Sequence, residues 1–362
     1  MRVGRSRRPG TANQLRNVEG CGRREADDRR TGHCSPVLPP LPPDAAFQSG
    51  VFSYAQAMAA GWRPWDVERC VADGTLVDLA HGSFAVADRL VGLDAVALHL
   101  LKVRARQLSV EPGWCAGRRS AVLAHGLPLI GMPPDVPQLV RDPAGTRAKA
   151  RSRHERIAPL PDGHQTRVDG LLTCTAARAV VDIARAEPFR NGVVVADAAL
   201  RRGVARAEME DVLRAMTRWP GVVQARQVVA FADGRAESPG ESCTRVACRT
   251  EGLGVPEPQV EVWRYGSFVA RLDLLFRAEL LAVEFDGAMK FTDAGVLPAL
   301  LARAEEIRDC GIAVVHTSWK ETFRDTRAFG LRVRRRLQEP GRVLAPGVEL
   351  RSTSVPRSAL AA

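Results

Sequence analysis

Three acidic residues, Asp273, Glu284 and Asp286, stand in two neighbouring apolar stretches of the sequence, and Lys290 follows them closely. Carboxylate oxygens are the ligands that Mg²⁺ and Mn²⁺ prefer in proteins. An ion held between them would polarise a phosphodiester and lower the pKa of an attacking water. Arginine makes up 48 of the 52 basic residues. A lysine at position 290 is therefore informative, because its compact ammonium can orient water or stabilise a phosphorane. The four residues together predict a metal-dependent phosphodiesterase site.

The strands that must position these carboxylates are indicated by apolar runs separated by turns. A hairpin centred between Ala278 and Glu279 places Asp273 opposite Glu284, with β-carbons about 5 Å apart. Side chains alternate along a strand, so Glu284 and Asp286 point to the same face. The predicted unit comprises a helix from 239 to 252 or 254, strands 259–265, 268–276 and 280–286 with turns at 266–267 and 278–279, a helix over 297–310 and a closing strand from 312. This is an αβββαβ core of α/β type.

Most of the acidic residues also have a plainer interpretation. Glu241 stands third in a helix that begins with Ser at the N-cap and Pro at the first position, so a capping box explains it as well as a metal-binding role does. Exposed acidic residues on an edge strand protect a sheet against aggregation, which is the alternative for Glu284 and Asp286. Asp273, flanked by two leucines, is harder to explain in this way. His316, in the closing strand, faces either the sheet core or the site and is interpreted as a satisfied structural histidine.

The last third of the chain carries four segments in a fixed order: ESPGES (237–242), ARLDL (270–274), AVEFDGAMKF (282–291) and VVHTSW (314–319). In these segments the chain resembles the PD-(D/E)xK superfamily, in particular the bacterial branch similar to the very-short-patch-repair (Vsr) endonucleases. The resemblance implies a restriction-endonuclease-like fold over residues 237–330. It further implies that Asp273 and Glu284 hold the metal, that Lys290 replaces the usual lysine near Asp286, and that Glu241 completes the shell.

One helix departs from that family. The related sequences carry a charged run in the helix before the closing strand, whereas residues 297–302 here read LPALLA. This departure makes a catalytically degenerate nuclease fold the alternative to an active enzyme.

Residues 47–90 are typical of two short helices followed by a hairpin. The helices, over 53–60 and 64–73, are each ended by a glycine, and strands 75–78 and 83–86 flank a His-Gly turn. This order is that of a small winged helix-turn-helix, whose second helix enters the major groove of DNA. Its candidate DNA contacts are Arg63, Trp65 and Arg69.

Two further observations bear on this N-terminal module. Three acidic residues on its second helix, Asp66, Glu68 and Asp73, would repel phosphate, so a small helical module that packs on its neighbour is the alternative. The segments VFSYAQAMAAG (51–61) and CVADGTLVDLAHGSFA (70–85) resemble the N-terminal domain of the AbiEi-type (type IV) antitoxins. That resemblance implies a DNA-binding winged helix used for autoregulation, and with it a possible toxin partner.

The remaining segments carry no assigned chemistry. Residues 1–46 are predicted to be a disordered basic arm, residues 91–230 a mixed α/β region similar to the middle of the same antitoxin-like proteins, and residues 331–362 a basic tail. The two ends, 1–30 and 331–362, each carry +5 of the net charge of +11, so charge alone is weak evidence for a nucleic-acid partner. Arg178 and Asp182 stand four apart on one predicted helix, and we expect them to form a surface ion pair.

Length and composition favour a soluble protein of two or three modules that is α+β overall. The apolar runs fall short of the roughly 18 residues needed to span a bilayer, and no secretory signal is evident. Eight cysteines without a CxxC pair predict free thiols in a reducing compartment. We therefore expect a cytoplasmic protein with no membrane partner.

Two functions remain open at this point. The first is a Mg²⁺- or Mn²⁺-dependent DNA endonuclease whose winged helix supplies duplex binding. The second is an antitoxin-like transcriptional regulator that keeps a nuclease fold only for contacts. The set of Asp273, Glu284, Asp286 and Lys290 favours the first, whereas the loose recognition helix and the altered helix at 297–310 favour the second. The sequence determines neither the substrate nor the oligomeric state.

Overall fold

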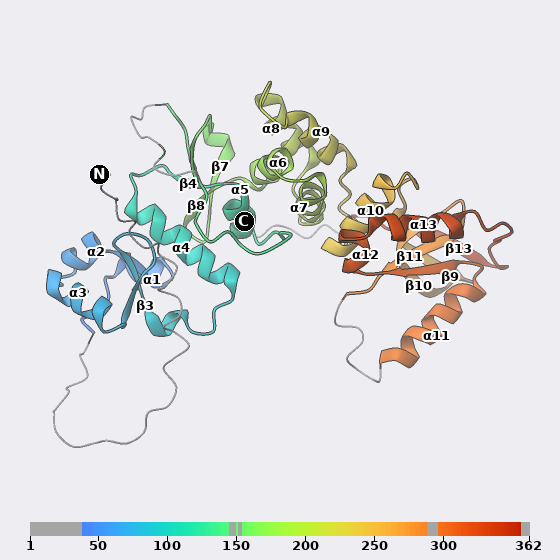
Figure 1. The fold of residues 1–362 in the computed structure, drawn as a ribbon, viewed down its shortest axis with the longest axis horizontal. Helices are drawn as coiled ribbons and strands as arrows, with labels where there is room; N and C mark the ends of the chain where they lie inside the picture. The colour runs from blue at the N-terminus through green and yellow to red at the C-terminus, as the bar shows by residue number, and fades with distance from the viewer. Residues whose placement is uncertain (1–37, 145–149, 151–153, 288–295, 356–362) are drawn as a thin grey trace, which may run out of the picture. The chain divides into compact units, whose positions relative to one another are not determined.

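A computed structural model describes residues 38–144, 150, 154–287 and 296–355, with the backbone alone for 296–301 (Figure 1). The described chain is mixed α/β and contains three sheets, with strand orders β1-β3-β2, β6-β5-β4-β8-β7 and β12-β11-β10-β9-β13. Its six described cysteines are buried free thiols, as the sequence predicts. Within the described ranges, no helix is both long enough and apolar enough to cross a membrane.

The N-terminal module has two helices followed by a hairpin, in the predicted order. Its elements are α1 (Asp44–Phe47), β1 (Val51–Ser53), α2 (Tyr54–Ala59), α3 (Pro64–Ala72), β2 (Leu76–Asp78), β3 (Ser83–Val86) and the 3-10 turn η1 (Ala87–Leu90). The Ser53 side chain and Gln56 form a capping box that starts α2. The predicted disordered arm, residues 1–46, extends too far into the folded chain. Helix α1 begins within it, at Asp44, and the Trp62 indole N–H donates to the Pro40 carbonyl at 2.8 Å.

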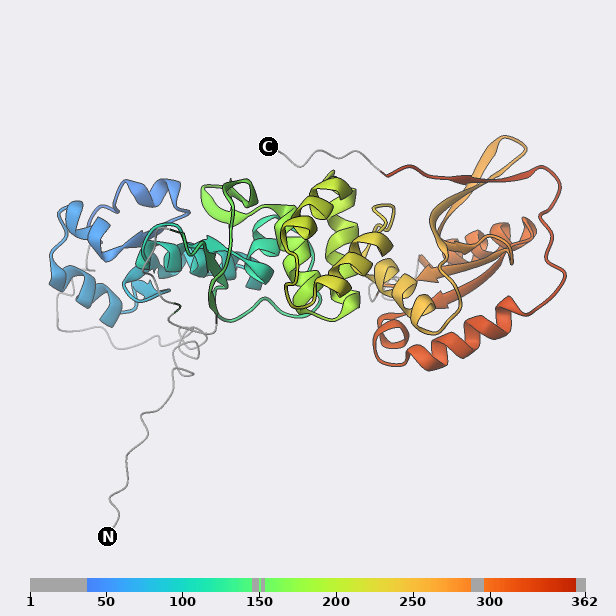
Figure 2. The same ribbon diagram turned by 90° about the horizontal axis from the view of Figure 1, so that it is seen from above.

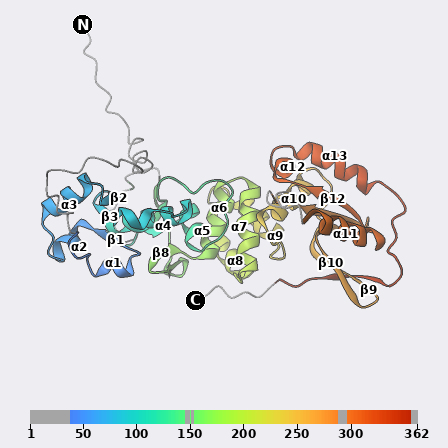
Figure 3. The same cartoon turned by 90° about the horizontal axis from the view of Figure 1, so that it is seen from below.

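The middle region is a small sheet followed by four helices. After α4 (Ala95–Ser109) come β4 (Cys115–Ala116), α5 (Arg118–Ala124), β5 (Leu139–Arg141), β6 (Glu155–Ile157), η2 (Asp162–His164), β7 (Gln165–Val168) and β8 (Leu171–Cys174). The helices α6 (Ala176–Ala186), α7 (Phe189–Arg201), α8 (Arg206–Ala215) and α9 (Val222–Phe231) then pack together (Figure 3). Val180, Val195, Val212 and Val228, one from each helix, belong to their shared core. Thr175 caps α6, its side chain accepting from the Arg178 N–H.

The ion pair expected in the middle region forms, but it is buried and does not lie at the surface. Arg178 and Asp182 do pair, with 2.8 Å between Arg178 Nε and Asp182 Oδ2, but only 2% of the Arg178 side chain is exposed. A spacing of four residues brings two side chains together on any helix face. It does not tell whether that face meets solvent, and here the neighbouring elements cover it.

The C-terminal region follows the predicted element order. It contains α10 (Pro239–Thr250), β9 (Glu257–Arg264), β10 (Ser267–Phe276), β11 (Leu281–Phe285), α11 (Val296–Asp309), β12 (Ala313–Thr317), α12 (Trp319–Phe323), α13 (Thr326–Leu337) and β13 (Val348–Ser352). Helices α10 and α13 contribute to one core on the sheet and α11 to another, so the sheet is covered on both faces (Figure 1). Strands β9 and β10 form a long antiparallel hairpin, light orange in Figure 2.

The hairpin register of β10 and β11 agrees with the prediction. Leu274 pairs with Val283 and Leu275 with Ala282, so continuing this register by one residue places Asp273 opposite Glu284. The turn predicted at 266–267 is shifted by one residue. Ser267 already pairs with Arg264 in the ladder, and the turn consists of Tyr265 and Gly266, both with positive φ. Two such residues suit the type I′ turn that joins tightly paired strands.

The predicted basic tail at 331–362 is wrong for its described part. Helix α13 buries Phe329 and Val333 in the sheet core, and β13 pairs with β9 along the outer edge. The folded unit therefore extends to about Ser352 instead of ending near residue 330. The abundant arginines of this segment hid an apolar spacing of four residues that is typical of a packed helix.

Candidate functional site

The two carboxylates at the centre of the candidate site are held by each other's strand. The backbone N–H of Phe285 donates to Asp273 Oδ2 at 2.9 Å. The backbone N–H of Asp273 donates to Glu284 Oε1 at 3.2 Å. Glu284 is only 5% exposed. The predicted pairing of these two residues thus places the half-buried Asp273 beside the buried Glu284.

Burial and mutual repulsion act strongly on this pair. Burial, followed by the negative charge of Asp273, raises the pKa of Glu284 to about 7, although Arg303 and the Asp273 N–H act against the shift. The pKa of Glu241 is raised as well, first by burial and further by the charge of Asp273. A group of carboxylates that resists full ionisation is one that a cation or a proton would stabilise.

Glu241 does more than cap its helix. Ser238 Oγ accepts from the Glu241 N–H, as the capping interpretation predicts, and also donates to Glu241 Oε1 at 2.9 Å. The other carboxylate oxygen, Oε2, accepts from the N–H of Glu237 and from the Gln259 amide, each at 2.9 Å. Gly240 allows α10 to approach β11 this closely, because a Cβ at that position would overlap the Phe285 ring. The carboxylate is therefore fixed beside the Asp273–Glu284 pair.

Helix α10 is anchored by a buried ion pair. Arg245 Nη1 lies 2.9 Å from Asp197 Oδ2 on α7, with side-chain exposures of 3% and 1%. Asp197 also accepts from the Ser242 hydroxyl and from the Asp233 N–H, each at 2.7 Å. Breaking one partner of such a pair leaves an uncompensated buried charge. The arrangement therefore restricts where Glu241 can lie.

The sequence interpretation missed Gln259. It is 3% exposed and holds a left-handed backbone with φ of 55°, which is costly for a residue other than glycine. Its amide donates to Glu241, while its Oε1 is buried and accepts no hydrogen bond from the described residues. The sequence of β9 gave no clear signal, because polar and charged residues alternate there with the buried Val260 and Val262.

Arg303 was also missed, although its charge lowers the pKa of Glu284 and so opposes the shift caused by burial. Its Nη2 lies 3.4 Å from Glu284 Oε2 and donates to the Arg271 carbonyl at 2.6 Å. Arg303 stands four residues before the buried Ile307, so helical spacing would have placed it on the sheet-facing side of α11. The apolar residues 297–302 that precede Arg303 gave no indication of a charged contact from this helix.

His316, for which the sequence left open whether it faces the sheet core or the site, lies on the carboxylate face and is paired with Asp286. Half of its side chain is exposed, and its Nδ1 lies 3.1 Å from Asp286 Oδ2. It pairs with Glu284 across the parallel strands β11 and β12, where it helps to lower the pKa of Glu284. The predicted site residue Asp286 therefore has a histidine neighbour at the strand ends. An alternation count along β12 could have placed His316 on this face.

The residues predicted to form the metal centre are only partly brought together. Lys290 lies outside the described residues. Among the residues that the structure describes, no three His, Cys, Asp or Glu side chains are grouped as a ready-made metal-binding set. Asp273 and Glu284 are brought together, Glu241 joins them through its electrostatic coupling to Asp273, and Asp286 turns toward His316.

The three residues predicted to contact DNA form one cluster, in which Arg63 and Trp65 are exposed and Arg69 is half-buried. The guanidinium carbons of Arg63 and Arg69 lie 4.5 and 5.1 Å from the ring centroid of Trp65, which is 47% exposed. Asp66 turns back to accept from the Arg63 N–H at 2.9 Å, and Asp73 accepts from the Thr75 N–H. These hydrogen bonds lower the pKa of both carboxylates and so favour their charged form, and Asp66 also forms an ion pair with Arg63 at 3.3 Å.

Comparison with known proteins gives distant relatives. No protein-family model matches the sequence. The chain is similar to two proteins of Mycobacterium tuberculosis, named Uncharacterized protein MT2308 in strain CDC 1551 / Oshkosh and Uncharacterized protein Rv2248 in strain ATCC 25618 / H37Rv. Each is 29% identical over 185 residues, which is 51% of this chain and 67% of the relative. Their names state no activity.

The repulsion at Glu284 predicts a pH-dependent stability of the metal-free protein. Its folded pKa of about 7 exceeds the ordinary value of 4.5, so ionisation penalises the folded state as the pH rises from about 5 to 8. Glu284→Gln should therefore be more stable than the wild type at pH 8 by roughly 2–3 kcal/mol, and nearly equal to it at pH 5. Urea unfolding in EDTA measures both values.

Glu349→Gln removes an exposed carboxylate from β13 and serves as the control. It should change stability little and equally at both pH values. A Glu284→Gln variant that is less stable than the wild type at pH 8 would contradict the account of repulsion at this site.

Proposed function

We propose that this chain is a Mg²⁺- or Mn²⁺-dependent DNA endonuclease with a restriction-endonuclease-like C-terminal domain and an N-terminal winged helix that binds duplex DNA. The observation that carries the proposal is the pair of half-buried Asp273 and buried Glu284, each accepting a hydrogen bond from the backbone of the other's strand. A fold seldom places two acidic groups side by side away from water unless their charge is used.

The residues present fit a divalent cation. Asp273 and Glu284 would hold it, with Glu241 as a further oxygen donor, since hard cations take carboxylate ligands. The raised pKa values of Glu284 and Glu241 support this assignment, because both reflect burial and the negative charge of Asp273. When bound, such an ion supplies polarisation of the phosphodiester and lowers the pKa of a coordinated water.

Arg303 and Lys290 would supply the other positive charges. The planar guanidinium of Arg303 offers several donors in the geometry that phosphate oxygens accept. It is 39% exposed and reaches Glu284 only at 3.4 Å, so it can also contact an incoming phosphate. Lys290 is assigned to the phosphorane by the family pattern alone. His316, half-exposed beside Asp286, places an imidazole next to the candidate site.

The N-terminal cluster would bring the duplex to this site. Arg63 and Arg69 carry charge to the phosphate backbone, and the exposed ring of Trp65 holds both guanidinium groups in place. Asp66 forms an ion pair with Arg63, so Arg69 is the stronger of the two candidates for a phosphate contact.

A regulator without nuclease activity is the second candidate. The ion pair between Arg303 and Glu284 favours it, because an internal cation can compensate a site that no longer binds metal. The apolar start of α11, residues 297–302, points in the same direction. Such an antitoxin-like regulator would bind its DNA without cleaving it, and a toxin partner would then be expected.

Plasmid cleavage separates the two candidates. The full-length wild type should nick supercoiled plasmid with Mg²⁺ or Mn²⁺ and not with EDTA. Asp273→Asn should reduce the rate at least ~100-fold, since the lost ligand contributes several kcal/mol of transition-state stabilisation. Asp309→Asn, a matched change at the exposed end of α11, should leave the rate unchanged. A wild type that binds DNA and never cleaves it would establish the regulator instead.

Duplex binding tests the N-terminal cluster. Arg69→Ala should weaken binding of full-length protein to a duplex about 3- to 10-fold and reduce the salt dependence by about one unit of slope. Arg226→Ala removes the same charge from the exposed face of α9 and should have no such effect. Equal affinities of both variants and the wild type across several salt concentrations would remove this cluster from DNA binding.

A further inference from the structure

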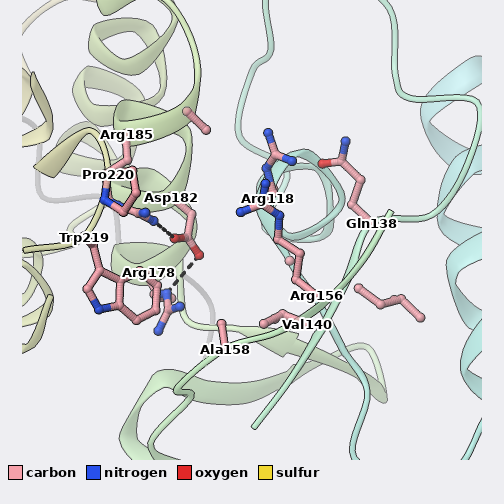
Figure 4. Close-up of a pocket in the computed structure, with 13 residues that line it drawn as sticks. Arg118, Gln138, Val140, Arg156, Ala158, Arg178, Asp182, Arg185, Trp219 and Pro220 are labelled. Atoms are coloured by element: carbon pink, nitrogen blue, oxygen red, sulfur yellow. Dashed lines mark hydrogen bonds and ion pairs between the residues drawn. The ribbon is translucent and has the colours of Figure 1, made fainter. Parts of the chain in front are cut away.

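A cavity of about 280 Å³ lies in the middle region, which the proposed nuclease function does not use. It is bordered by the start of α5, strands β5 and β6, helix α6 and the segment before α9 (Figure 4). Four arginines line it together with a single carboxylate, that of Asp182; they are Arg118, Arg156, Arg178 and Arg185. The lining therefore carries a clear excess of positive charge.

One wall of the cavity is held rigidly. Asp182 accepts from Arg178 Nε at 2.8 Å and from Arg185 Nη1 at 2.9 Å. The two guanidinium carbons lie 5.3 and 4.8 Å from the ring centroid of Trp219. Arg178 Nη1 further donates to the Pro159 carbonyl at 3.2 Å. Since Asp182 is shared by two arginines, this wall keeps a net positive charge in a fixed geometry.

Arg118 and Arg156 form the opposite side, as Figure 4 shows. Arg118 has a left-handed backbone with φ of 51°, and its Nε is buried without a hydrogen-bond partner among the described residues. Burial lowers the pKa of Arg118, and the nearby charge of Arg156 lowers it further. The neighbouring carboxylate of Glu187 is already bound by Arg119 at 2.9 Å. The carboxylates that attract Arg118, those of Glu187 and Asp182, are thus already bound by other arginines, and the wall holds a strained cation that they compensate only in part.

Strain and incompletely compensated charge of this kind are typical of a binding site. We propose that the cavity binds a phosphate monoester group, held between Arg118 and Arg156 on one side and Arg185 on the other. A doubly charged group with several acceptor oxygens matches the excess of charge and the planar guanidinium donors better than a single carboxylate does. The group can belong to a small molecule such as a nucleotide or to the 5′ end of a nucleic-acid strand.

Calorimetric titration of the full-length protein tests the site. The probes are inorganic phosphate, a nucleoside monophosphate, citrate, and one short single strand with either a 5′-phosphate or a 5′-hydroxyl. We expect the phosphate probes to bind, and Arg118→Gln and Arg156→Gln each to weaken them at least tenfold. Arg226→Gln, an equal loss of charge outside the cavity, should bind like the wild type. Thermal melts check that every variant remains folded.

The two sources of phosphate give different results, and each supports the site. Binding of free phosphate and the monophosphate, with equal affinity for both strands, indicates a small-molecule ligand. Tighter binding of the 5′-phosphorylated strand, lost in Arg118→Gln, indicates a strand end. The proposal is overturned if no phosphate probe binds, if citrate binds in preference to them, or if Arg118→Gln and Arg156→Gln both bind like the wild type. These outcomes do not depend on nuclease activity.

Discussion

The pairing of β10 with β11 sets two negative charges against each other, and the surrounding C-terminal elements are arranged to tolerate them. Moving an ionised carboxylate out of water is costly unless other groups compensate it. Here the backbone N–H groups of Asp273 and Phe285 donate to the two carboxylates, and α11 brings Arg303 close to Glu284. The compensation is incomplete, because the pKa of Glu284 is still raised to about 7. A site with this residual cost gains stability from any cation that binds there.

The geometry of α10 follows from the same constraint. Its first turn carries Glu241 toward Asp273, and the close approach to Phe285 is possible because residue 240 is glycine. Farther along the helix, Arg245 forms the buried pair with Asp197 of α7. One helix therefore contributes an acidic group to the candidate site at its start and contacts the middle region along its length. Substituting Arg245 or Asp197 is therefore expected to displace Glu241 indirectly, through the position of α10.

The hairpin was predictable because it depends on local rules. A turn centre and the alternation of side chains were enough to place Asp273 opposite Glu284, and the register of Leu274 with Val283 agrees with them. Local spacing gives only the face on which Arg303 and His316 lie; that α11 and β12 bring them to Glu284 depends on contacts between elements distant in sequence. The burial of Arg178 and the packing of α13 were missed for a related reason: charged residues conceal an apolar face unless the neighbouring elements are known.

The central proposal is that Asp273 and Glu284 hold a divalent cation. The most direct measurement is an anomalous difference map, recorded near the manganese edge, from crystals of the full-length protein grown with Mn²⁺. The account predicts a peak within coordination distance of carboxylate oxygens from both Asp273 and Glu284. Manganese peaks elsewhere on the molecule, with none at these two residues, would contradict it.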